Sequence, residues 1–163
     1  MTGQGSADPE VLKAKQAAVK LLAPRARLRT YLEQRLGKRG FSEAAVQSAL
    51  DALAGAGYVD DAQYAQDRIE GVLLKGPQWR PALLATLEAD GLDPELAERA
   101  VTERLAGEDQ RQWACEAARQ RLSKTKSDDQ DVTGRRLGSY LARRGFDDEV
   151  IIAVLEEVLP QSH

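Results

Sequence analysis

The chain has 163 residues, of which 42% are hydrophobic and 30% charged, a composition typical of a soluble folded protein. Aromatic residues make up only 5%, which argues against a β-sandwich, because sheets favour aromatic and β-branched residues. The single cysteine, Cys115, excludes an intrachain disulfide, and the single histidine, His163, excludes the usual zinc ligand sets. No apolar run is long enough to cross a bilayer or to act as a secretory signal, so we expect a cytoplasmic protein that holds neither metal nor cofactor.

The first predicted element is a helix over Pro9–Leu22, where apolar residues recur at helical spacing. A frame of the form Leu-x3-Leu-x3-Gly follows it and begins at Leu32. Leucines four residues apart lie on one helix face, and Gly40 can adopt the left-handed conformation that ends a helix. Ser42 then suits the N-cap of a further apolar helix. The frame therefore predicts a helix, a tight turn and a second helix.

The same frame recurs twice, and each copy again follows a predicted helix. The first leucines and turn glycines are Leu83 with Gly91 and Leu137 with Gly145, and the preceding helices cover Asp61–Leu74 and Glu108–Leu122. We predict an all-α protein of three tandem three-helix repeats that stack into an elongated curved body, because each unit is too small for a large core of its own. The expected units are 9–59, 60–106 and 107–159, with tails at 1–8 and 160–163 and a long polar loop over 123–133.

The most distinctive string, GYVDDAQYA, begins at Gly57. Its residues suit a structural role: Gly57 ends a helix, Tyr58 and the valine after it pack back, and Asp60 or Asp61 caps the next helix ahead of Tyr64.

Two isolated side chains have simpler interpretations. Cys115 lies among small apolar residues and is interpreted as a buried hydrophobe. Trp79, between two prolines, suits either an exposed anchor or the lid of a repeat junction.

The net charge of −3 hides strongly charged blocks along the chain. Residues 13–39 hold nine basic residues and one acid, whereas 62–110 hold ten acids and five bases. Basic pairs precede the outer turn glycines, where they also interact favourably with the helix dipole, but the middle repeat has Ala89-Asp90 there. That difference favours a partner role for the outer clusters. The candidate partner-binding or DNA-binding residues are Arg25, Arg27, Arg29, Arg35, Lys38, Arg39, Arg135, Arg136, Arg143 and Arg144.

Catalysis is the weakest interpretation of this sequence. Neither a phosphate-binding G-x-x-x-x-G-K-[ST] loop nor a G-x-G-x-x-G turn after a strand is present, and the carboxylates are scattered over helices and caps. We therefore predict no catalytic residue. Only Tyr31 and Tyr140 lie close to the basic clusters, so sequence-specific reading of single strands is not indicated.

Two strings resemble the RecX family. GYVDDAQYA is similar to the family hallmark G-Y-[LIV]-[DN]-D-x-x-[FY]-A, and YLARRGF at 140–146 resembles the corresponding C-terminal segment. The resemblance implies a non-enzymatic regulator, a monomer, that binds the RecA–DNA filament in its groove and inhibits strand exchange and ATP hydrolysis, in DNA repair and the SOS response. It implies RecA as the partner, with weak binding to single- or double-stranded DNA. The middle repeat departs from the family pattern at Asp90, where a basic residue is expected.

Two alternatives of other classes stay open. Short helices joined by tight turns also suit a free-standing DNA-binding module, and a tandem repeat can serve as an inert scaffold or adaptor. Affinity for naked DNA, compared with affinity for a RecA filament on the same DNA, separates the first alternative from the RecX interpretation.

Overall fold

The computed structural model describes residues 8–161, and all of its regular secondary structure is helical. This confirms the all-α prediction. The helices within that range are α1 (Pro9–Leu22), α2 (Arg29–Lys38), α3 (Glu43–Gly55), α4 (Asp61–Leu73), α5 (Arg80–Ala89), α6 (Pro94–Leu105), α7 (Gln110–Leu122), α8 (Gln130–Arg143) and α9 (Asp148–Val158). Apart from residues 8, 160 and 161, the expected tails lie outside the described residues.

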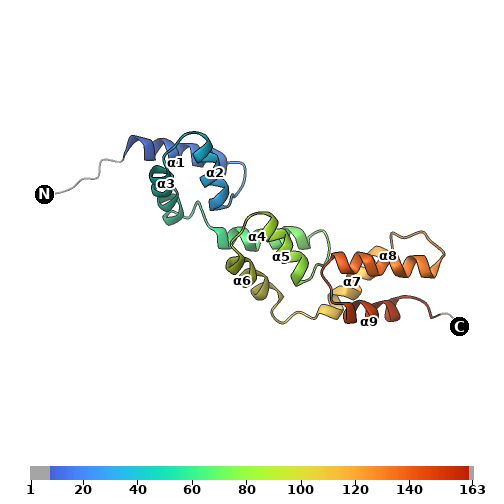
Figure 1. Cartoon of the computed structure of the whole chain (residues 1–163). Helices are drawn as coiled ribbons and strands as arrows, with labels where there is room; N and C mark the ends of the chain where they lie inside the picture. Colours follow the sequence, from blue (N-terminus) through green and yellow to red (C-terminus); the bar gives the residue numbers. More distant parts are fainter. Residues whose placement is uncertain (1–7, 162–163) are drawn as a thin grey trace.

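The helices form three successive groups along an elongated body whose ends carry the two termini (Figure 1). We call α1–α3 repeat 1, α4–α6 repeat 2 and α7–α9 repeat 3. In each repeat the first helix packs against the third, and each repeat has its own cluster of buried apolar side chains. The core is therefore divided into three small units rather than shared by the whole chain.

The three turn glycines occupy equivalent positions. Gly40, Gly91 and Gly145 have φ angles of +90°, +91° and +87°, the left-handed conformation that the frame predicts. The frame leucines before them are at most 2% exposed, namely Leu32, Leu36, Leu83, Leu87, Leu137 and Leu141. The helical spacing of the leucines and the glycine that ends the helix are both local sequence features, and together they define the repeating unit.

One detail differs from the sequence-based expectation, and two others differ between the repeats. Helix α8 begins at Gln130, because the Asp129 carboxylate caps it, so the polar loop is shorter than the expected 123–133. Asp147 makes no side-chain cap; its carboxylate and its backbone N–H both bond to Gln110 instead. Phe41 is only half-buried, whereas its counterparts in the other repeats, Leu92 and Phe146, are 4% exposed.

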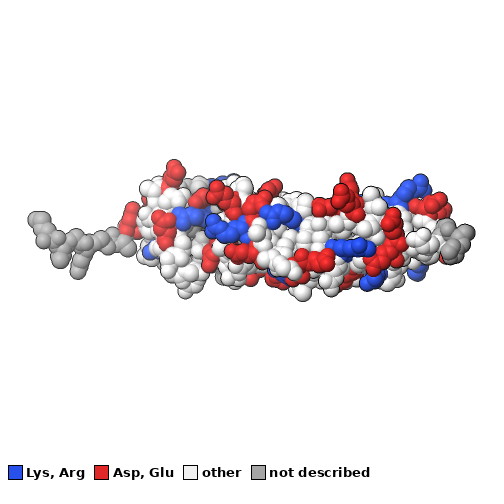
Figure 2. Space-filling view, turned by 90° about the horizontal axis from the view of Figure 1, so that it is seen from below, with Lys and Arg blue, Asp and Glu red and all other residues white. Residues whose placement is uncertain are grey.

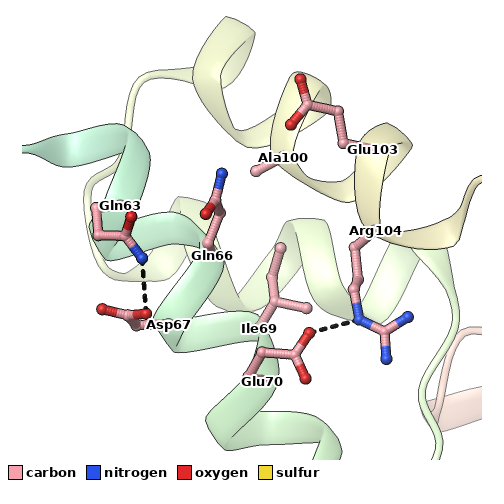
Figure 3. A pocket seen from close by; sticks show the side chains of 8 residues that line it. All are labelled: Gln63, Gln66, Asp67, Ile69, Glu70, Ala100, Glu103 and Arg104. Carbon is pink, nitrogen blue, oxygen red and sulfur yellow. Dashed lines mark hydrogen bonds and ion pairs between the residues drawn. The ribbon is translucent and has the colours of Figure 1, made fainter.

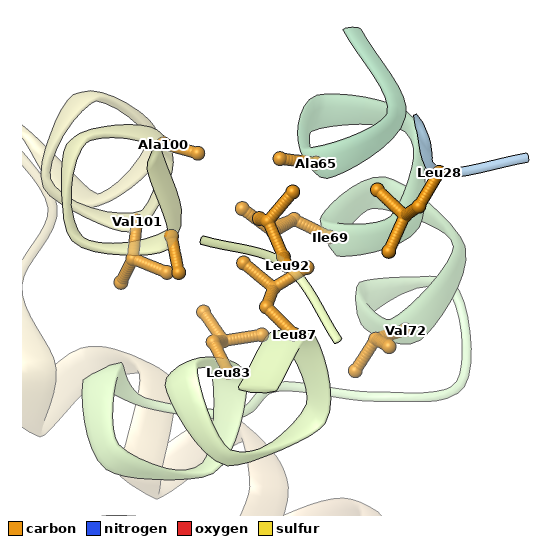
Figure 4. Close-up of a cluster of buried hydrophobic side chains, with 10 residues drawn as sticks. Leu28, Ala65, Ile69, Val72, Leu83, Leu87, Leu92, Ala100 and Val101 are labelled. Carbon is orange, nitrogen blue, oxygen red and sulfur yellow. The ribbon is translucent and has the colours of Figure 1, made fainter. Parts of the chain in front are cut away.

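Apolar side chains from each of the first two repeats pack against the core of the next repeat. Leu28, the N-cap residue of α2, is 3% exposed and belongs to the cluster of repeat 2 (Figure 4). Trp79, the N-cap residue of α5, packs against the cluster of repeat 3. Trp79 is thus the lid of a repeat junction, the second of its two expected roles. These two residues occupy equivalent positions, so both junctions use an apolar N-cap residue that packs against the next repeat.

Candidate interaction surface

The ten basic candidates form two groups at opposite ends of the body. One group lies on α2 and the segments flanking it in repeat 1, and the other lies on α8 and the residue after it in repeat 3. Repeat 2 separates them, so the fold does not gather them into one patch. On the face shown in Figure 2, basic and acidic side chains are interspersed along the whole body.

Seven of the ten are exposed and form no ion pair with any residue between 8 and 161. They are Arg25, Arg35, Lys38, Arg39, Arg135, Arg136 and Arg143. A guanidinium or ammonium group that lacks an internal carboxylate partner keeps its charge available to an external anion. These seven side chains form the free part of the candidate surface.

Arg29 is engaged inside repeat 1. Its guanidinium forms ion pairs with Glu33 at 3.2 Å and Asp51 at 2.6 Å and donates to Gln47 at 2.7 Å. The bond to Asp51 contributes most to raising the pKa of Arg29 above its ordinary value. At the equivalent position of repeat 2, Arg80 bonds Glu98 in the same way. The arginine at this position therefore ties the second helix of a repeat to the third.

Arg144 belongs to the junction between repeats 2 and 3. Its Nη1 donates to the Pro77 carbonyl at 3.3 Å, and its own carbonyl accepts the Trp79 N–H at 2.8 Å. The side chain is half-buried and lies 5.0 Å from the centroid of the Tyr140 ring. Arg143 and Arg144 are neighbours in sequence, but only Arg143 is free.

Arginine side chains cover the two tyrosine rings near the basic groups. Arg27 lies 4.6 Å and Arg35 5.6 Å from the centroid of the Tyr31 ring. Arg121 and Arg144 approach the Tyr140 ring at 5.1 and 5.0 Å. These cation–π contacts occupy ring faces that nucleobases would otherwise use for stacking.

The GYVDDAQYA string has the expected structural role at most of its positions. Gly57 has a φ of +85° after α3, and Val59 is 7% exposed in the core of repeat 1. The Asp60 carboxylate caps α4 by accepting the Gln63 N–H at 3.0 Å. Tyr58 is 65% exposed, so the prediction that it packs back was wrong: the chain turns at Gly57 so that only the valine enters the core.

Asp61 and Tyr64 have inter-element roles that the string did not predict. Asp61 accepts the backbone N–H of Arg29 at 3.0 Å and so links repeat 2 to repeat 1. The Tyr64 hydroxyl donates to Asp90 at 2.9 Å, and Arg68 donates to the same oxygen at 2.8 Å. Burial and the bond to Asp90 raise the pKa of Tyr64. The sequence offered no signal for the Asp61 contact, and for the Tyr64 contact only the alignment of the repeats, which sets Asp90 at the position of the basic Arg39 and Arg144.

Repeat 2 has an acidic groove between α4 and α6 (Figure 3). Its volume is about 300 Å³, and acidic side chains from both helices, Asp67, Glu70 and Glu103, line it. Arg104 also lines the groove but forms an ion pair with Glu70. The middle of the body therefore presents an excess of acids, and three of its five cations are paired with carboxylates, in contrast to the two ends.

Repeat 3 holds the cysteine. Cys115 is 7% exposed, as its interpretation as a buried hydrophobe requires, and its thiol lies 3.4 Å from a Glu157 oxygen. Burial is the main reason why the pKa of the thiol is raised. Within residues 8–161, histidine, cysteine and acidic side chains form no group of three or more that could bind a metal ion. None of the helices in that range has the length and apolar character needed to cross a membrane.

Comparison with known proteins identifies the family. The family model described as RecX, first three-helix domain, matches residues 14–53. The regulatory protein RecX of Amycolatopsis mediterranei (strain U-32) is 35% identical over 147 residues, which cover 90% of this chain and 83% of that protein. That of Mycobacterium marinum (strain ATCC BAA-535 / M) is 37% identical over 149 residues, or 88% and 85% of the two chains.

Solved structures agree on the fold. The crystal structure of RecX from Lactobacillus salivarius superposes with a TM-score of 0.72 at 18% identity and covers 91% of this chain and 96% of that one. A second crystal structure, of a regulatory protein RecX, gives 0.73 at 17% identity and covers 90% and 73%. Given the identity to the curated relatives over most of both chains, this protein belongs to the RecX family of regulatory proteins.

Proposed function

We propose that this chain regulates a RecA recombinase by binding the RecA–DNA filament, and that it inhibits strand exchange and ATP hydrolysis without a catalytic activity of its own. Family membership supports the regulatory role. The observation that carries the binding mode is the presence of unpaired cations at both ends of an elongated body.

The pairing of cations differs sharply between the repeats. Residues 9–59 contain nine lysines and arginines against four acids, and of these cations only Arg29 forms an ion pair within the described chain. Residues 107–159 also contain nine cations, of which Arg111 and Arg119 are paired, both with Glu157. Residues 60–106 have ten acids and five cations, and three of those cations are paired. Electrostatic attraction to an anionic surface is therefore concentrated at the two ends.

This distribution suits a rigid bridge on a polyanionic filament. The basic ends contact phosphate or acidic protein surface at two separate places, and the acidic repeat between them contacts basic protein surface or solvent. A body held at two places couples neighbouring filament subunits. Strand exchange and ATP hydrolysis need those subunits to move relative to one another, so the bridge slows both.

Charge-removing variants at the two ends test this proposal. Lys38→Gln/Arg39→Gln and Arg135→Gln/Arg136→Gln remove exposed, unpaired cations, and Arg99→Gln removes an exposed, unpaired cation of repeat 2 as the matched control. Lys38 and Arg39 lie at a helix end, where a cation stabilises by only about 0.3–1 kcal/mol, and substitutions of exposed residues elsewhere usually change stability by less than about 0.5 kcal/mol. All three variants are therefore expected to fold. Arg144 is left intact because it holds the second junction.

Affinity for RecA filaments and for naked DNA is measured at two salt concentrations. We expect both end variants to bind filaments more weakly and with a flatter salt dependence, because each lost phosphate contact lowers the slope by about one. The Arg99 variant should bind like the parent chain. Unchanged filament affinity in both end variants would refute the proposed binding mode. A loss on naked DNA with none on filaments would favour the free-standing DNA-binding module.

A further inference from the structure

In repeat 3, the turn at Gly145 is a docking site that is occupied by the start of α5 from repeat 2. The Trp79 N–H donates to the Arg144 carbonyl at 2.8 Å, and the Trp79 ring stacks on Phe146 with centroids 6.5 Å apart. A Cβ added to Gly145 would lie 2.7 Å from the backbone nitrogen of Ala82. The start of α5 is therefore seated directly on the turn of the following repeat.

Repeat 2 contains the same arrangement with different side chains. Leu28 is 3% exposed in the cluster that includes Leu92, the residue after the turn glycine. The Arg29 N–H donates to Asp61 at 3.0 Å, and the Thr30 hydroxyl lies 3.8 Å from a Cβ added to Gly91. Here the start of α2 is seated on the turn.

The two occupants share a chemistry that no other described helix start has. Each begins with a large apolar residue at the N-cap position and no side-chain cap, and one amide at this start donates to the next repeat. The donor is the Arg29 N–H, to the Asp61 carboxylate, at the first junction, and the Trp79 N–H, to the Arg144 carbonyl, at the second. The other N-cap residues between 8 and 161 are all polar, namely Asp8, Ser42, Asp60, Asp93, Asp109, Asp129 and Asp147. The turns thus select uncapped helix starts with an apolar first residue.

Repeat 1 has the same turn with no described residue seated on it. Gly40 matches the other two in φ, but no atom of residues 8–161 lies within 4 Å of an added Cβ. Phe41 is half-buried. The Arg39 carbonyl accepts no hydrogen bond from residues 8–161, unlike the Arg144 carbonyl, although the Asp90 carbonyl of repeat 2 accepts none from them either. Lys38 and Arg39 are exposed and unpaired beside the Gly40 turn. The half-buried Phe41 ring, the unbonded Arg39 carbonyl and two unpaired cations therefore lie together at one end of the body.

We propose that the Gly40 turn is a docking site for the start of a helix on RecA. A large apolar N-cap residue of that helix packs on Phe41, and the N–H of this residue donates to the Arg39 carbonyl, as the Trp79 N–H does to the Arg144 carbonyl. Lys38 and Arg39 favour a helix with acidic residues in its first turn, where acids are common and stabilising. A second copy of this chain does not supply the occupant from residues 8–161, since the two helix starts of this kind there are already seated. The inference rests on the proposed binding to RecA filaments and names the contact.

Site-specific photocrosslinking tests the contact in the full chain. Lys38→Cys and Ala89→Cys, each combined with Cys115→Ala, place one reactive cysteine at equivalent exposed positions beside an open turn and a filled turn. Each variant is labelled with a photoreactive maleimide and illuminated on RecA–DNA filaments. We expect several-fold more RecA adduct from position 38 than from position 89, with the adduct mapping to the first turn of a RecA helix.

A second pair of variants measures the energy of the contact. Phe41→Ala should weaken filament binding about tenfold, as expected for an apolar interface anchor. Ile152→Ala, which removes an apolar side chain that is 58% exposed in repeat 3, should leave binding unchanged. Circular dichroism checks that both variants are folded.

The outcomes separate this inference from the function on which it rests. If the unmodified chain does not sediment with RecA filaments, the proposed function and this contact both fail. If it sediments, but positions 38 and 89 give equal adducts, or position 38 reacts only with DNA, or Phe41→Ala binds like the parent, the docking site is refuted and the proposed function stands.

Discussion

Replacing each turn glycine with alanine is a matched test of how the repeats are joined. Gly40, Gly91 and Gly145 share nearly the same left-handed φ, so each alanine meets the same backbone penalty of about 1–2 kcal/mol. At Gly40 the added Cβ enters open space, and at Gly91 it comes to an ordinary contact distance of 3.8 Å from the Thr30 hydroxyl. We therefore expect the free energy of unfolding of these two variants to fall only by the backbone penalty.

The Gly145→Ala variant should lose considerably more of its free energy of unfolding. Its Cβ would lie 2.7 Å from the Ala82 nitrogen and 3.1 Å from the Trp79 carbonyl oxygen, and backbone atoms cannot rotate away as a flexible side chain can. Relief requires repeat 2 to shift away from repeat 3. Overpacking of this kind costs about 1–3 kcal/mol, which with the backbone penalty gives a total of about 2–5 kcal/mol.

The chain carries its own reporter for this measurement. Trp79 and Trp113 are its only tryptophans, and their ring centroids lie 5.7 Å apart at the second junction. Intrinsic fluorescence during urea unfolding therefore reports on that junction, while circular dichroism reports on all helices. In the Gly145 variant the fluorescence transition should move to lower urea and precede the loss of helix. If Gly145→Ala is no more destabilising than Gly40→Ala, the close junction inferred from the structure is wrong.

Two further predictions concern the first junction. Asp60→Ala removes the cap of α4 and should lower the free energy of unfolding by about 0.5–2 kcal/mol in thermal denaturation, with RecA-filament affinity unchanged well below the melting temperature. Asp61→Ala keeps the cap of α4 but removes the acceptor of the Arg29 amide, so the loss of stability should be confined to repeats 1 and 2. If either variant lost filament binding without losing stability, these structural roles would be contradicted. The raised pKa of Tyr64 means that its protonated hydroxyl stabilises the fold below the unfolded pKa of about 10, and this contribution disappears as pH rises through the folded pKa. The stability advantage of the parent over Tyr64→Phe, measured by urea unfolding, should therefore shrink above about pH 10, and a constant difference would argue against the Asp90 bond.

The features that sequence alone predicted are local ones. The helix expected over Pro9–Leu22 has those bounds in the structure, because its apolar spacing and its N-terminal aspartate and proline act within a few residues. The turn glycines were predicted for the same reason. The start of α8 was placed too late because Asp129 caps the helix within a polar stretch that lacks apolar spacing. Local signals thus set the elements, and errors arose where two local signals competed.

The junctions could not be predicted, because their partners are distant in sequence. Arg144 and Pro77 are 67 residues apart, and nothing near either one indicates that the guanidinium of the first meets the carbonyl of the second. The same holds for Asp61, which reads as a second possible cap yet accepts an amide from 32 residues away. The sequence predicted which residues are basic candidates. It could not predict which of them are paired within the chain, because that depends on what each repeat packs against.

One position shows how the division arises. Arg39, Asp90 and Arg144 follow the second helix of their repeats, immediately before the turn glycine, with similar backbone angles: φ is −80°, −71° and −82°. At the two filled turns this residue bonds to neighbouring elements: Asp90 accepts from Tyr64 and Arg68, and Arg144 contacts the preceding repeat through both its carbonyl and its guanidinium. At the open turn no described helix is seated, and the Arg39 side chain has no partner among residues 8–161. The Gly40 turn is therefore open within the described residues, and unpaired positive charge flanks it. At this turn a partner can repeat the seating of a helix start on a turn, which the chain already makes twice with itself.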